Sequence, residues 1–187
     1  MASTDDLQET AQQQDAAMDV FAPAFGKTGL SLLEKVKIQA QVLVPVLRAF
    51  RAELGEERAN QIASLALREW SAKLFQDVGD QLPGNPRQKW DALNEALLKH
   101  VGSDIDFEMI KEAPDAWEFN VTSCRYADFF QQLGEPELGA LLTCEMDVDI
   151  EAVGGPGVTM TRTQTIMKGA NYCDFRFQMK TGSRSEG

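Results

Sequence analysis

The chain has 187 residues, 43% of them hydrophobic and 25% charged, which is typical of one soluble globular domain with a core large enough to fold without disulfides or metal. A net charge of -11 argues against nucleic-acid binding, because phosphate contacts need clustered Lys and Arg. The N-terminus has neither a basic start nor an apolar run, and no later segment could span a bilayer. With three cysteines, an odd number, these features predict a cytoplasmic protein with free thiols.

Residues 1–19 are polar and unpatterned, and they are predicted to form a mobile tail. A single α+β domain is expected over residues 20–187, with a helical part at 28–101 and a sheet part at 104–180. The boundary falls at Gly102, where the spacing of the apolar residues changes from helical to alternating.

The helical part contains three predicted helices. The first begins near Leu33 and ends at Gly55, the second covers about 56–78, and the third opens with Asn85 as N-cap and Pro86 in the first turn. Apolar residues spaced by three and four predict the buried faces: Leu33, Val36, Ala40, Leu43, Leu47 and Phe50 on the first helix, Ile62, Leu65, Ala66, Trp70, Leu74 and Val78 on the second, and Trp90, Leu93, Leu97 and Val101 on the third.

His100, the one histidine, falls at the exposed end of the third predicted helix. A cation at a helix C-terminus is favourable, so a structural role is preferred over a catalytic one. Without a usable histidine, Ser-His and Cys-His catalytic arrangements are excluded.

The sheet part alternates apolar and polar residues in four segments. Two hairpins are predicted, one around the turn Ala113-Pro114-Asp115 and one around Gly169-Ala170-Asn171. The predicted segments are, in order, strands at 105–111 and 117–122, short helices at 125–133 and from Pro136 to 144–147, and strands at 158–167 and 173–179. The fold class is therefore α+β, with an N-terminal helical layer packed on a four-stranded antiparallel sheet interrupted by two short helices.

The three cysteines each lie close to a carboxylate or an arginine. Cys144 and Asp147 are three residues apart, so both would project from one face if the helix continues through them. Cys124 precedes a helix, whose dipole would lower the thiol pKa and make Cys124 the better nucleophile. The acidic neighbours of Cys144 should raise its pKa.

The last predicted strand makes it difficult for Cys173 and Asp174 to act together in one catalytic site. Cys173 and Asp174 are adjacent there and should point to opposite sides. Cys173, beside two phenylalanines, also fits a small core residue. Asp174 and Arg176 also fit a surface ion pair of little energetic weight.

Several short motifs of the chain carry a family resemblance. They are Cys124 and Tyr126, then Leu133-Gly134 with Glu137-Leu138 running into Cys144 and Asp147, then Arg162-Thr163-Gln164-Thr165, and finally Gly169 to Arg176. In this order they resemble the L-2-amino-thiazoline-4-carboxylic acid hydrolase family, over roughly the C-terminal third of the chain.

The resemblance implies hydrolytic opening of a small cyclic carbon–nitrogen substrate, in which water adds to an amidine-like carbon. Asp147 would hold the amidinium and activate water, a cysteine would attack covalently or donate a proton, and Arg162 or Arg176 would bind the substrate carboxylate. The catalytic candidates are Cys124, Cys144, Asp147, Cys173 and Asp174, and the substrate-binding candidates are Tyr126, Arg162, Thr163, Thr165 and Arg176. No cofactor is expected.

The alternative is a small-molecule-binding module without turnover, because the C-terminal segment is also similar to the vinyl-reductase-type ligand-sensing domains of bacterial regulators. Such domains can hold zinc, for which Cys124, Cys144, Glu145 and Cys173 would be candidates. The Cys-x-x-Cys spacing of a strong zinc signal is missing. Either reading predicts a small-molecule partner, with no nucleic acid and no membrane, and leaves homo-oligomerisation open.

Overall fold

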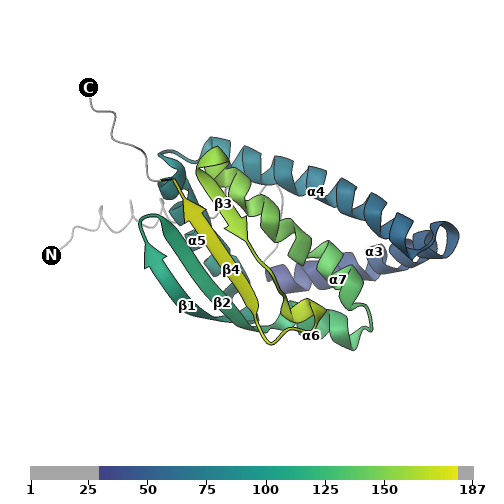
Figure 1. The fold of residues 1–187 in the computed structure, drawn as a ribbon. Helices are drawn as coiled ribbons and strands as arrows, with labels where there is room; N and C mark the ends of the chain where they lie inside the picture. Colours follow the sequence, from purple (N-terminus) through teal and green to yellow (C-terminus); the bar gives the residue numbers. More distant parts are fainter. Residues whose placement is uncertain (1–29, 181–187) are drawn as a thin grey trace, which may run out of the picture.

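The structure is a computed structural model that describes residues 30–180, so the predicted tail at 1–19 lies outside the described residues (Figure 1). It has a helical layer and one sheet, as the predicted α+β class requires. None of the helices within residues 30–180 combines the length and the apolarity that crossing a lipid bilayer needs.

Three long helices begin the described chain: α3 at Leu32–Leu54, α4 at Glu56–Gln81 and α5 at Pro86–Val101. Gly55 joins α3 to α4 with a φ of 79°, a backbone conformation that favours glycine. Asn85 caps α5 by accepting a hydrogen bond from the backbone of Gln88, which confirms the predicted start. In Figure 1 the α3–α4 hairpin extends beyond the sheet.

The sheet contains β1 (Ile105–Ala113), β2 (Ala116–Cys124), β3 (Val158–Thr161) and β4 (Cys173–Met179). Its order is β1-β2-β4-β3, and each neighbouring pair is antiparallel, as predicted. Between β2 and β3 lie α6 (Arg125–Gln132), α7 (Pro136–Leu142) and a series of 3₁₀ turns, η2 (Cys144–Gly157). Single 3₁₀ turns, η1 (Gly102–Asp104) and η3 (Ile166–Lys168), precede β1 and β4.

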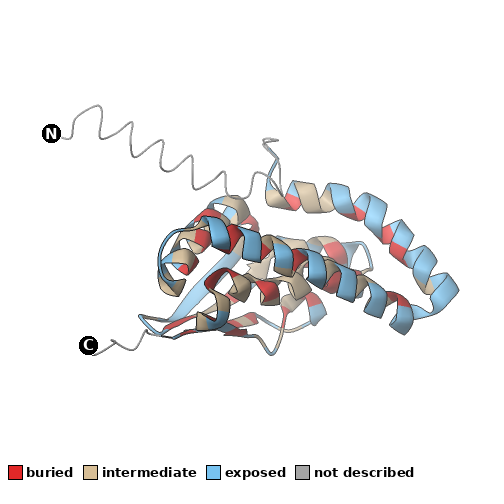
Figure 2. Cartoon of the chain, turned by 90° about the horizontal axis from the view of Figure 1, so that it is seen from above, coloured by how far each residue is buried: buried red, intermediate tan, exposed pale blue. Residues whose placement is uncertain are grey.

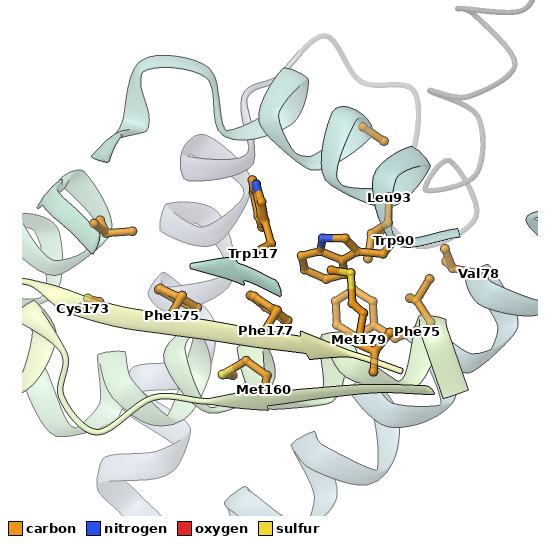
Figure 3. Packing of buried hydrophobic residues seen from close by; sticks show 14 residues of the cluster. Phe75, Val78, Trp90, Leu93, Trp117, Met160, Cys173, Phe175, Phe177 and Met179 are labelled. Atoms are coloured by element: carbon orange, nitrogen blue, oxygen red, sulfur yellow. The ribbon is translucent and has the colours of Figure 1, made fainter. Parts of the chain in front are cut away.

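One face of the sheet carries the larger hydrophobic cluster. Cys173, Phe175, Phe177 and Met179 follow one another along β4 on this face, and Trp90 of α5 packs on Phe177 with ring centroids 4.1 Å apart (Figure 3). A second cluster joins α3 to α6, α7 and η3. Cys124 and Ile166 contact both clusters, so the end of β2 marks the junction of the two cores.

The predicted buried face of α4 is wrong over most of its length. Leu65 is 66% exposed and Trp70 is 48% exposed, and Ile62 is exposed as well. The residues that α4 buries are Ala59, Ser71, Phe75, Val78 and Gly79. The side of α4 that faces η2 is a different one, and it includes Ser71, which donates a hydrogen bond to the buried Asp149.

The predicted stripe of α3 is confirmed only in part. Leu33, Ala40 and Leu47 are buried, and Val44 joins them. Leu43 and Phe50 are exposed, because they lie on a second apolar side of the helix.

The third predicted strand is shorter than expected. β3 ends at Thr161 instead of reaching Met167, because the side chain of Asp174 binds the backbone amides of Thr163 and Gln164 and holds them out of the ladder. Arg162 is therefore the first residue beyond the sheet.

Candidate functional site

The candidate site is built around an ion pair between Asp147 of η2 and Arg162 at the end of β3. The Nη1 of Arg162 donates to Oδ2 of Asp147 at 2.5 Å, and its Nη2 donates to the carbonyl oxygen of Cys144 at 2.7 Å. The Arg162 guanidinium also packs over the Phe175 ring, 5.1 Å from its centroid. The side chain of Arg162 is 9% exposed and that of Asp147 is 33% exposed, so the arginine is almost fully buried and the aspartate only partly.

Phe175 was not among the candidates drawn from the sequence. The available signal was the strand alternation, which places Phe175 on the same side of β4 as Cys173.

The α7 helix does not continue through Cys144, contrary to the helical interpretation of this segment. It ends at Leu142, and the chain continues as the 3₁₀ turns of η2. Residues three apart are eclipsed in a 3₁₀ helix, so Cys144 and Asp147 still lie one above the other. One guanidinium therefore reaches both residues.

Three thiols lie within the electrostatic influence of the Asp147 carboxylate. Burial is the main reason that the pKa of Cys124 is raised to about 11 and that of Cys144 to about 12, and the charge of Asp147 acts in the same direction on both. Burial also raises the pKa of Cys173, with a smaller contribution from Asp147. The tertiary structure thus brings together all three cysteines, which are free thiols.

The expectation for Cys124 was wrong in sign. Backbone amides of Ala127 and Tyr126 at the start of α6 do lower its pKa, as the helix-dipole argument requires, but burial outweighs them. At neutral pH all three thiols carry their protons. They are therefore poor nucleophiles.

Tyr126 joins Asp147, Arg162 and the three cysteines in this group. Its hydroxyl is buried and has no hydrogen-bond partner among residues 30–180. Burial raises its pKa, and the charges of Asp104, Cys124 and Asp147 act in the same direction. An unpartnered buried hydroxyl costs free energy unless a ligand or water satisfies it.

Burial also raises the pKa of the Asp147 carboxyl, although Arg162 acts in the opposite direction. A raised pKa makes the carboxylate a stronger base when it is ionised. The pair thus presents a base that is oriented by one guanidinium and surrounded by protonated donors.

Asp174 lies on the opposite side of β4 from Cys173, as the alternation predicts. Its carboxylate accepts hydrogen bonds from the amide and hydroxyl of Thr163 and from the amide of Gln164. Burial opposes its charge, but these hydrogen bonds outweigh burial and lower the pKa of Asp174. Asp174 and Thr163 therefore shape the segment that carries Arg162.

Thr165 and Arg176 also have structural partners. Thr165 is buried, and its hydroxyl accepts a hydrogen bond from the amide of Lys168. Arg176 donates to the carbonyl of Phe119 and to the side chain of Asn120, and its nearest carboxylate is Glu118 at 3.7 Å. The interpretation of Asp174 and Arg176 as an ion pair is wrong, because each binds a different part of the chain.

A pocket of about 310 Å³ lies beside this group, between α4, α7, η2 and η3. It is lined by Asn60, Gln61, Ser64, Glu137, Ala140, Leu141, Glu145 and Lys168. Glu145 is held in place by the hydroxyl of Ser64 at 2.7 Å. Neither the three cysteines nor Asp147 line this pocket.

Within residues 30–180 no three His, Cys, Asp or Glu side chains converge in a way that could hold a metal ion. The zinc candidates Cys124, Cys144, Glu145 and Cys173 therefore do not form a preassembled set in this structure. Glu145 instead turns toward Ser64 on α4.

Comparison with known proteins bears on the group around Asp147. Residues 35–177 match the family model described as L-2-amino-thiazoline-4-carboxylic acid hydrolase. The chain belongs to this family. The match spans far more of the chain than the motifs noted in the sequence, and it includes every member of the group around Asp147.

No curated protein matches the chain significantly. Among solved structures, the phenol-responsive sensory domain of the transcription activator PoxR, crystallised with phenol, is similar with a TM-score of 0.47 and 12% sequence identity over 90% of each chain.

Proposed function

We propose that this L-2-amino-thiazoline-4-carboxylic acid hydrolase family member hydrolyses the ring of a small cyclic amidine that carries a carboxylate, such as 2-amino-thiazoline-4-carboxylate. Family membership supports the hydrolase class. The observation that carries the chemistry is the Asp147 carboxylate, one-third exposed, oriented by Arg162 and set among protonated thiols.

In the proposed reaction Asp147 acts as the general base. It removes a proton from water as the water oxygen bonds to the amidine carbon, and the bond between that carbon and a ring heteroatom then breaks. The departing atom takes a proton from a neighbouring acid. The unpartnered hydroxyl of Tyr126 and the thiol of Cys144 are the candidate donors.

A covalent cysteine mechanism is less well supported. A thiolate is the nucleophilic form, and at neutral pH a thiol with a pKa of about 11 or 12 is almost entirely protonated. Water activated by Asp147 avoids this cost. Arg162 serves here as a positioning residue, because Asp147 and the carbonyl of Cys144 already occupy its guanidinium.

The test is ring-opening of 2-amino-thiazoline-4-carboxylate by purified wild-type protein and by Asp147→Asn. Loss of the general base should lower the rate on the order of a hundredfold or more. The matched control is Asp128→Asn, which makes the same change at an exposed position of α6 and should leave the rate nearly unchanged.

Equal rates for Asp147→Asn and wild type would rule out the assigned base. Because Asp147 must be ionised to act, the wild-type rate should rise with pH through its raised pKa. Wild-type protein that binds the substrate tightly without opening the ring would instead indicate a binding module without turnover.

A further inference from the structure

The α3 helix has two apolar sides, and the described chain covers only one of them. The covered side packs on α6 and α7 through Ala40, Val44 and Leu47. The uncovered side is a row of large apolar residues spaced by four, here called the α3 ridge: Ile38, Val42, Val46, Phe50 and Leu54. They are 44–65% exposed, whereas an apolar side of a helix ordinarily faces the core. In Figure 2 exposed positions recur along the outer side of α3.

The orientation of α3 is fixed by its opposite side. Glu135, in the turn between α6 and α7, accepts a hydrogen bond from Arg48 at 2.5 Å and lies 3.7 Å from Arg51. Lys37 packs over the ring of Phe129. These contacts hold the opposite side of α3 toward α6 and α7, so residues 30–180 leave the ridge uncovered.

The area of the ridge fits a protein partner. At about half exposure, and with roughly 150–200 Å² per large side chain, the ridge together with the neighbouring Leu43 exposes on the order of 500 Å² of apolar surface. Apolar atoms make up about 65% of a homodimer interface, so this corresponds to roughly 800 Å² per partner. That is the area that each side of a standard stable interface buries.

We propose that the α3 ridge is the contact between two copies of this chain. The spacing of four residues forms one ridge of the kind that interdigitates with an identical ridge when two helices cross at about -50°. A two-fold axis near Val46 would set Val46 against its own copy and Val42 of one copy against Phe50 of the other, so that apolar residues meet at the centre of the crossing. This inference does not depend on the proposed function.

Charge gives the dimer a distinctive salt dependence. Each copy carries a net charge of -11, so long-range repulsion opposes association while the contact itself is apolar. Salt screens the repulsion and leaves apolar burial in place. The dimer should therefore tighten as ionic strength rises, which is the opposite of an interface built from ion pairs.

Sedimentation of the full chain, from micromolar to sub-millimolar concentration, tests the proposal. Wild type should sediment at twice the monomer mass of 20.7 kDa, and Val46→Glu should sediment as a monomer because two carboxylates would meet at the axis. Glutamate is a good helix former, so α3 should persist, and circular dichroism checks this. The control is Ile110→Glu on β1, which changes an apolar residue that is 53% exposed outside α3 and should leave the dimer intact.

A wild-type protein that stays monomeric throughout the concentration range would overturn the proposal, even if another molecule or segment covers the α3 ridge. So would a dimer that survives Val46→Glu, a dimer that Ile110→Glu also dissociates, or a stoichiometry other than two. A wild-type dimer that weakens with added salt would contradict the apolar contact.

Discussion

Breaking the Asp147–Arg162 pair tests whether the candidate site is shielded from water. The perturbation is a double-mutant cycle with Asp147→Asn, Arg162→Met and the double variant. Breaking a buried pair costs about 3–5 kcal/mol, and exposed pairs contribute about 0–1 kcal/mol. Since Arg162 is 9% exposed but Asp147 is 33% exposed, the coupling free energy should be about 2 kcal/mol. The bond from Arg162 to Cys144 is lost in both Arg162 variants and cancels in the cycle.

The assay is urea denaturation of the four proteins at neutral pH, at low and high salt. The control cycle uses Lys73 and Asp77, which pair at 3.0 Å on α4 with 76% and 53% of their side chains exposed. Its coupling should be about 0.5 kcal/mol or less and should vanish in salt. A coupling for the Asp147–Arg162 pair no larger than that of the control pair would refute the inference that this partly buried pair is better shielded from water than an exposed pair.

Two further predictions concern the thiols and the packing of η2. The pKa of Cys124 is about 11 against an ordinary 9.0, so this thiol should alkylate more slowly than in the unfolded chain, at a rate that rises until about pH 11. The contribution of the protonated thiol to stability is complete below pH 9 and is lost as the pH rises through 11. An alkylation rate that levels off near pH 9 would contradict the raised pKa. In Gly79→Ala the new Cβ would lie 2.6 Å from the carbonyl oxygen of Val153, so the helix-propensity gain of about 1 kcal/mol should be outweighed by an overpacking cost of up to about 3 kcal/mol. The melting temperature should then fall by a few degrees, at about 2–4 °C per kcal/mol for a chain of this size. A higher melting temperature would contradict the close packing of Gly79 against the backbone of Val153.

The sequence alone determined the order of the helices and strands and several of their ends, although not the 3₁₀ turns of η2 or the end of β3. Gly55 and Asn85 mark helix ends because backbone conformation and capping are local properties, and the change of period at Gly102 marks the start of the sheet because strand alternation is local as well. Family membership could also be predicted from the sequence, since short motifs such as Cys173 to Arg176 can be recognised without any knowledge of packing.

Tertiary structure alone decided which surfaces are covered and what the reactive groups experience. Periodicity shows that a helix has an apolar face, but not whether a neighbour covers it, and so Leu65 and Phe50 were assigned to the core although they are exposed. In the same way, the local helix N-terminus predicted a lowered pKa for Cys124, whereas burial by residues distant in the chain raises it. The convergence of Cys124, Cys144 and Cys173 on Asp147 arises because β2, η2 and β4 meet at one end of the sheet, and contacts between segments so far apart leave no periodic trace in the sequence.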